Sequence, residues 1–286
     1  MKRRVFSHHL LAAGLVMLQP SISHPEDMLK RRRLRFTITF SNPTNRKLDK
    51  QQFWCYLPAN ATYTQRLIGV EVSMAHQITS DVFGHSILEL TFDEFPAFSQ
   101  KIVSVTTEVE YKTKATTQQT VDLNVWLMPE RFIESDHESI RALASSLQKS
   151  AKIKTAQSIF EWVRDNITYA GYIPEDLGAL QALQHRRGDC TEYADLVVAL
   201  ARASGLAARM VGGYVVDHDV APRPQDYHNW AEIYLDDSWR LVDSQKGSWM
   251  ESKSQYIVFR IYRDLPSNLV EQAHRYRLKG DLQVTF

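Results

Sequence analysis

The sequence predicts an α+β protein in which an all-β sandwich precedes a part that mixes helices with antiparallel strands. From Leu34 onward apolar and polar residues alternate at the period of a strand, and clusters of turn residues separate the runs. After Met128-Pro129-Glu130 the apolar residues take the spacing of helices, and a hairpin pattern follows further on. We therefore predict a sandwich domain at residues 30–129 and a second domain at residues 130–286.

The first 23 residues resemble an export signal. Lys2-Arg3-Arg4 is a positive start, Leu10 to Leu18 is a short apolar run, and Ser21-Ile22-Ser23 offers small residues for cleavage. Against export, the basic cluster Lys30 to Arg33 would follow the cleavage point, and Met28 is an alternative start that would leave the protein in the cytoplasm. We predict a signal peptide at residues 1–23 and a periplasmic or secreted protein, with a cytoplasmic one as the alternative.

The strands of the sandwich are marked by alternating apolar residues. Turn signals lie at Asn42-Pro43, Pro58-Ala59-Asn60 and Phe83-Gly84. The predicted strands include Leu34–Phe40, Ile68–Met74, Val103–Tyr111 and a closing strand at Val121–Leu127.

Two helices are predicted after the boundary. Ser135 and Glu138 have the spacing of a capping box ahead of an apolar stripe from Ile140 to Leu147. A second stripe with helical spacing runs from Ile153 to Ile167.

Cys190 is the strongest chemical signal in the chain. It follows Gly188 and Asp189, which are turn and cap residues, and it precedes an apolar helical stripe. A cysteine at a helix N-terminus meets backbone N–H groups that stabilise a thiolate, which is the nucleophilic form. Cys55, within Phe53-Trp54-Cys55-Tyr56-Leu57, is instead expected to be a small buried apolar residue, and no disulfide is expected.

His228 and Asp243 are predicted to share one face of a hairpin. A two-residue turn at Asp236-Asp237 pairs Leu235 with Ser238, and continuing that register places Asp243 opposite Trp230. Diagonal neighbours on one face lie within side-chain reach, so the carboxylate can orient the imidazole. The alternatives are that His228 is a structural histidine and that Asp243 is an ordinary residue at the end of a strand.

With these residues in order, the chain resembles the transglutaminase-like superfamily over roughly residues 150 to 250. The resemblance rests on four blocks: Arg187 to Cys190, Ala201 to Tyr214, His228 to Glu232, and Trp239 to Asp243. It implies a papain-like core in which Cys190 is the nucleophile, His228 the general base and acid, and Asp243 the residue that orients the imidazole. Asn229 stands where the family often has a small residue, and we expect it to face away from the cysteine.

Further site residues follow from this resemblance. The backbone N–H of Cys190 is the first expected oxyanion donor, and Gln184 or Tyr169 is a candidate for the second. Trp230 and Tyr227 are candidates for substrate binding, although aromatic residues beside strands are more often part of the core.

Composition limits the remaining functional classes. The net charge of +1 over 286 residues gives no reason to expect a nucleic-acid partner. No metal-ligand spacing and no apolar run long enough for a membrane span is present, so we expect no metal, no cofactor and no integral membrane segment. The expected partner is a peptide or protein substrate, whose amide bond is attacked by a thiol with water as acceptor. A transglutaminase or amide synthase that transfers the acyl group to an amine, and an inactive binding module, remain alternatives.

Overall fold

The structure is a computed structural model that describes residues 30–60, 65–111, 122–216, 218–219, 221–223, 226–250, 255–265 and 267–286. The predicted signal peptide lies outside these residues. Within them, no helix is both long enough and apolar enough to cross a membrane.

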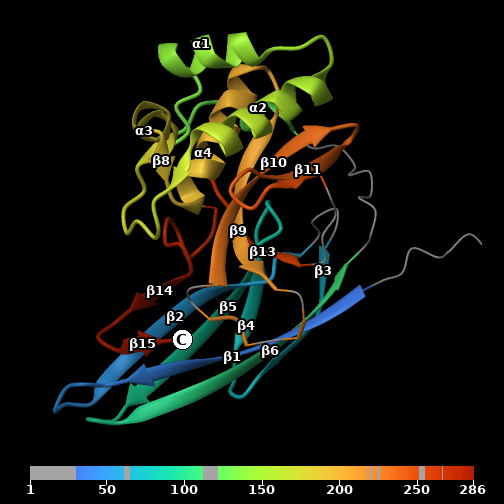
Figure 1. Ribbon diagram of the computed structural model, residues 1–286. Coiled ribbons are helices and arrows are strands. Elements are labelled where there is room, and N and C mark those ends of the chain that lie inside the picture. Colours follow the sequence, from blue (N-terminus) through green and yellow to red (C-terminus); the bar gives the residue numbers. More distant parts are fainter. Residues whose placement is uncertain are drawn as a thin grey trace, which may run out of the picture.

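The N-terminal region forms two four-stranded antiparallel sheets, which lie at the bottom of Figure 1. One sheet has the order β15-β1-β6-β3 and the other has the order β14-β2-β5-β4. The apolar faces of the two sheets meet in a core that includes Ile38, Phe40, Phe53, Leu90 and Val103. The strands are β1 (Lys30–Ser41), β2 (Leu48–Leu57), β3 (Gln65–Val72), β4 (Gln77–Ser80), β5 (Ser86–Phe95), β6 (Gln100–Tyr111), β14 (Tyr276–Lys279) and β15 (Gln283–Thr285).

The second region packs four α-helices against a five-stranded antiparallel sheet of order β12-β11-β10-β9-β13 (Figure 1). Its strands are β9 (Ala208–Val215), β10 (Tyr227–Leu235), β11 (Ser238–Asp243), β12 (Ser248–Trp249) and β13 (Tyr256–Ile261). The helices are α1 (Glu138–Leu147), α2 (Lys152–Asn166), α3 (Gly178–His185) and α4 (Cys190–Ala203). A short parallel pair, β7 (Thr168–Tyr169) and β8 (Arg187–Gly188), lies beside the start of α4.

Helix α4 is the buried centre of this region. It packs on β9 and β10 and is covered by the other three helices, and its apolar residues Leu196, Val198 and Leu200 are fully buried. The predicted α+β class is therefore confirmed, with a β-rich N-terminal region ahead of a helical and antiparallel part.

Two local predictions were wrong. Helix α1 begins after His137, whose Nδ1 accepts a hydrogen bond from the Ser139 backbone N–H, and not after Ser135. Residues 122–127, placed in a closing strand, contain a 3-10 helix at Asn124–Trp126 instead. Trp126 is buried there against Trp239, so tertiary packing overrides the alternating pattern.

The two regions are joined by buried contacts. The Gln65 amide bonds to the backbone of Ala59 and Val258, and His85 accepts a hydrogen bond from the Ile261 backbone N–H. In addition, β14 and β15 pair with β2 and β1 although they follow the second region in sequence. The bounds 30–129 and 130–286 stay a prediction, and we propose that the sandwich unit also includes β14 and β15.

Candidate active site

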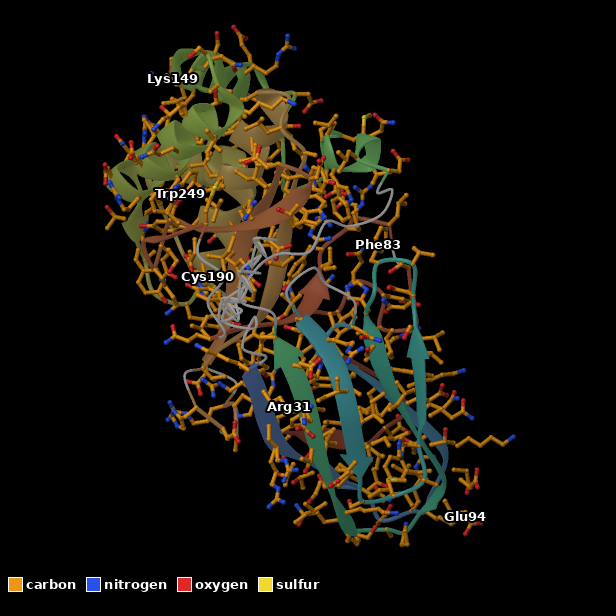
Figure 2. All side chains as sticks on the ribbon, turned by 90° about the vertical axis from the view of Figure 1, so that its right-hand side faces the viewer. Arg31, Phe83, Glu94, Lys149, Cys190 and Trp249 are labelled. Carbon is orange, nitrogen blue, oxygen red and sulfur yellow. The ribbon has the colours of Figure 1, made fainter. Side chains whose placement is uncertain are left out.

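Cys190 is the first residue of α4, directly after the N-cap Asp189 (Figure 2). The Asp189 carboxylate accepts hydrogen bonds from the backbone N–H groups of Thr191 and Ile173, at 2.7 and 3.0 Å. Glu192 reaches back to the backbone N–H of Asp189, at 2.8 Å, which completes a capping box. This cap fixes the position of the cysteine on the helix.

Gly188 is required for that cap. A Cβ on Gly188 would lie 2.4 Å from the Cβ of Glu192, so any other residue would push the capping side chain away. The same glycine pairs with Tyr169 in the β7–β8 pair, which brings the Tyr169 side chain to the cysteine.

His228 and Asp243 lie on the predicted hairpin in the predicted register. Leu235 pairs with Ser238 and Ala231 pairs with Val242, which confirms the pairing inferred from the two-residue turn. The His228 Nε2 atom lies 2.7 Å from Asp243 Oδ2, and both residues are buried. The other ring nitrogen, Nδ1, is therefore available to exchange a proton with another group.

Two further donors hold the Asp243 carboxylate. The Tyr256 hydroxyl, on β13, donates to Oδ2 at 2.8 Å, and the Lys246 backbone N–H donates to Oδ1 at 3.0 Å. Burial by itself raises the pKa of Asp243, but the hydrogen bond and charge of His228, with these two donors, outweigh it and lower that pKa. Asp243 is thus held as a carboxylate behind the imidazole. Tyr256 was missed, because nothing in its sequence neighbourhood links it to the hairpin.

A cleft of about 210 Å³ brings Cys190 and His228 together. Cys190, which lines the cleft, lies near the middle of the long axis of the molecule, between the helices and the sandwich (Figure 2). The cleft is lined by Tyr169, Cys190, Val215, Asp226, Tyr227, His228, Gln245 and Lys246.

The cysteine is a thiol at rest. Burial raises the pKa of Cys190 to about 11, and the Asp189 carboxylate adds to the rise, whereas the backbone N–H of Asn229 opposes it. The helix N-terminus alone would favour a thiolate, but here the same N-terminus also holds the carboxylates of Asp189 and Glu192. An adjacent base therefore has to remove the proton.

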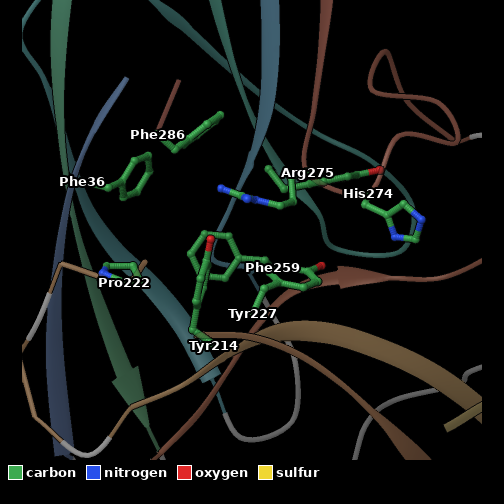
Figure 3. Close-up of a pocket in the computed structure, with 9 residues that line it drawn as sticks. Phe36, Tyr214, Pro222, Tyr227, Phe259, His274, Arg275 and Phe286 are labelled. Carbon is green, nitrogen blue, oxygen red and sulfur yellow. The ribbon is translucent and has the colours of Figure 1, made fainter. Parts of the chain in front are cut away.

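The other site residues suggested by the sequence lie in different places. Tyr169 lines the cleft, whereas Gln184 lies on the exposed side of α3 and is not among the cleft residues. Tyr227 lines the cleft and also a small aromatic cavity of about 20 Å³ between the two regions, together with Phe36, Tyr214 and Phe286 (Figure 3).

Trp230 and Asn229 differ from expectation. Trp230 is 1% exposed and packs near the His228 ring, with centroids 6.1 Å apart, so burial leaves it no surface for substrate contact. Asn229 does not face away from the cysteine helix, because its amide donates to Thr191 Oγ1 at 3.0 Å. Gly212 makes room for this, since a Cβ there would lie 2.5 Å from Asn229 Oδ1.

Comparison with known proteins identifies the domain that contains this site. Residues 141–244 match the family model of the transglutaminase-like superfamily, so the chain contains a transglutaminase-like domain. No curated protein sequence matches the chain.

Solved structures resemble this chain to different degrees, and the first of the two described next shows the same fold. A candidate cysteine protease from Cytophaga hutchinsonii is 19% identical, with a TM-score of 0.62 over 91% of this chain and 90% of that chain. The periplasmic domain of TgpA from Pseudomonas aeruginosa is 16% identical, with a TM-score of 0.41 over 78% of this chain and 86% of that chain. The first likeness extends over both regions of the molecule, including the sandwich.

Proposed function

We propose that this chain is a thiol-dependent enzyme that hydrolyses amide bonds in a peptide or protein substrate. The observation that carries the proposal is the shared cleft of Cys190 and His228, with Asp243 bound to the far side of the imidazole. A nucleophile, a base and a group that orients the base are the parts that acyl transfer needs.

The reaction would begin with proton transfer from the Cys190 thiol to His228 Nδ1. The sulfur then attacks the amide carbon, and the backbone N–H of Cys190 stabilises the oxyanion. Tyr169 is the better placed second donor, since it lines the cleft and Gln184 does not. The imidazolium gives its proton to the leaving amine, and water, activated by the same histidine, releases the acid and restores the thiol.

Hydrolysis and acyl transfer are separated by the acceptor. We expect the protein to release ammonia or amine from glutamine-containing peptides without an added primary amine, because the cleft residues are largely polar and admit water. The measurement is ammonia and amine release, with and without dansylcadaverine. Incorporation of dansylcadaverine at a rate comparable to hydrolysis would instead assign a transglutaminase or amide synthase.

The two cysteines supply a matched control. Cys190→Ala is expected to abolish turnover, whereas Cys55→Ala is expected to retain it, because Cys55 is buried in the sandwich core. Iodoacetamide is expected to label Cys190 well before Cys55, whose thiol pKa burial also raises. Full activity in Cys190→Ala would remove Cys190 as the nucleophile, whereas no turnover of any amide by the native protein would favour the inactive binding module.

We also propose export of the protein, on the basis of the basic and apolar residues at positions 1–23. A reporter fused after residue 30 is expected to be exported, and a mature protein is expected to begin near His24. Cytoplasmic protein that starts at Met1 or Met28 would contradict this.

A further inference from the structure

A second and larger cavity lies beside the N-terminal half of α4. Its volume is about 710 Å³, and it is lined by Thr191 and Asp195 of α4, by Asp176 before α3, and by Arg260 and Tyr262 near the end of β13. Thr191 follows Cys190 in the chain, so one residue separates this cavity from the nucleophile. No step of the proposed reaction so far uses it.

A polar wall divides the cavity from the catalytic cleft. Asn229 donates to Thr191 and accepts from the Tyr262 hydroxyl at 3.1 Å, and the Tyr262 hydroxyl lies 3.4 Å from that of Tyr227. Tyr227 lines the cleft on the other side. A molecule in the cavity would therefore lie beside the same helix N-terminus as a substrate bound at Cys190.

Asp195 is a buried carboxyl group without a partner. The residue is 1% exposed, and neither carboxyl oxygen has a hydrogen-bond partner among the described residues. Such a group loses its hydration on burial, and the free-energy cost of this loss is offset only when a hydrogen-bond donor binds to the carboxyl group. Burial raises the pKa of Asp195 well above its usual range, and the carboxylates of Glu192, Asp176 and Glu134 add to the rise. The guanidinium of Arg202 opposes this rise, but the three carboxylates outweigh it, so the surrounding potential favours a cationic donor.

Arg260, in the same cavity, is a buried cation that lacks hydrogen-bond acceptors. It is 4% exposed, its guanidinium lies 4.0 Å from the centroid of the Tyr262 ring, and within the described part of the chain its Nη1 atom has no hydrogen-bond partner. Its other terminal nitrogen donates to the Gln272 carbonyl, at 3.4 Å, and the guanidinium also lies 5.8 Å from the centroid of the Tyr56 ring. The nearby carboxylate of Asp176 already bonds to His274. A buried guanidinium in this state fits a carboxylate.

We propose that this cavity binds a zwitterionic amino compound, with its ammonium group at Asp195 and its carboxylate at Arg260. The two unpartnered groups then satisfy both ends of one ligand. The inference deepens the proposed function, on which its role rests: the ligand is the amine product, an amino acid or a peptide end with a free carboxylate. In the first half of the reaction the C–N bond breaks, the acyl group stays on sulfur, and the nitrogen takes one proton from His228 and leaves as a neutral amine. A second proton, from water, converts this amine into the ammonium ion that binds in the cavity.

The test is a binding measurement that needs no turnover. Full-length Cys190→Ala protein is titrated calorimetrically with glycine, 4-aminobutyrate and 6-aminohexanoate, and with hexylamine and hexanoate as single-charge controls. At least one zwitterion is expected to bind about tenfold or more tightly than either control, because a single charge-assisted hydrogen bond is worth about that factor. Equal affinity for all five compounds, or no binding, would overturn the proposal.

Variants assign the two ends of the ligand. Asp195→Asn is expected to make the zwitterion bind no more tightly than hexanoate. Arg260→Lys keeps the charge but loses the planar fork, and it is expected to reduce the difference in affinity between the zwitterion and hexylamine. Glu138→Gln, on the exposed start of α1, is the control expected to bind unchanged. Unchanged binding in Asp195→Asn would refute the assignment even if Arg260→Lys does not fold.

The two proposals fail separately. If the zwitterion binds but the protein with Cys190 intact cleaves no amide, the cavity stands and the hydrolase does not. If amides are cleaved but no zwitterion binds, the hydrolase stands without this product site.

Discussion

Replacing Asp243 by asparagine tests how the imidazole is oriented. In the native site Oδ1 accepts from the Lys246 backbone N–H, and Oδ2 accepts from His228 and from Tyr256. The asparagine oxygen is expected to stay with Lys246, since the reverse orientation would set two N–H donors against each other. The amide NH₂ then faces His228 Nε2, which becomes an acceptor.

The histidine is thereby locked in the wrong tautomer. Its proton lies on Nδ1, so this nitrogen can no longer take the proton of the Cys190 thiol, whose pKa of about 11 keeps it protonated. General-base catalysis contributes about 10²- to 10⁴-fold. We therefore expect kcat/KM for amide hydrolysis to fall by that factor, which is about 3 to 5 kcal/mol of transition-state stabilisation. The loss should be smaller than that of Cys190→Ala.

The assay pairs kcat/KM with the iodoacetamide rate of Cys190 and with the melting temperature. The melting temperature is expected to change little, because the Tyr256 hydroxyl can still donate to Ser248 Oγ, 3.0 Å away. Asp237→Asn, in the exposed turn of the same hairpin, is the matched control and is expected to be fully active. Wild-type kcat/KM in a folded Asp243→Asn protein would refute the tautomer argument.

Two other substitutions test the helix cap and the contact between the regions. Asp189→Asn removes a carboxylate that raises the thiol pKa, so the pH profile of Cys190 alkylation should shift to lower pH. The control Asp136→Asn, on the surface, should leave this profile unchanged. An unshifted profile in Asp189→Asn would contradict the stated cause. Burial by itself raises the pKa of Asp81, but the hydrogen bond and charge of His85, with the hydrogen bonds from Ser267 and Asn268, outweigh it and lower that pKa. The Asp81 carboxylate therefore stabilises the folded protein fully above the unfolded pKa of about 3.9. This contribution is lost as the pH falls through the folded pKa. Asp81→Asn should thus lower the free energy of unfolding at neutral pH by about 2 to 4 kcal/mol and flatten its acid limb in urea titrations, and equal slopes would contradict this.

The hairpin could be predicted because its information is local. A two-residue turn fixes the register, and a period of two then decides which side chains share a face, so His228 and Asp243 follow from counting. The start of α4 is equally local, since Gly188, Asp189 and Glu192 form its cap within five residues.

The contacts that were missed are long-range. Tyr256 reaches Asp243 from a different strand of the sheet, and Asn229 meets Thr191 across 38 positions of the chain. Tyr169 and Gln184 could not be ranked from the sequence, because only the β7–β8 pairing brings Tyr169 to the cleft. Spacing alone carries no information on which distant elements become neighbours.

The return of β14 and β15 to the N-terminal sheets determines when the sandwich can be completed during synthesis. Strands β1 and β2 are made first, yet each keeps one edge without its neighbour until residues 276–285 have left the ribosome. Until then the exposed edges can pair with other chains. Expressing residues 30–129 alone would produce that incomplete state permanently, so a fragment that folds has to carry residues 276–285 as well, for instance by circular permutation through a linker from β15 to β1.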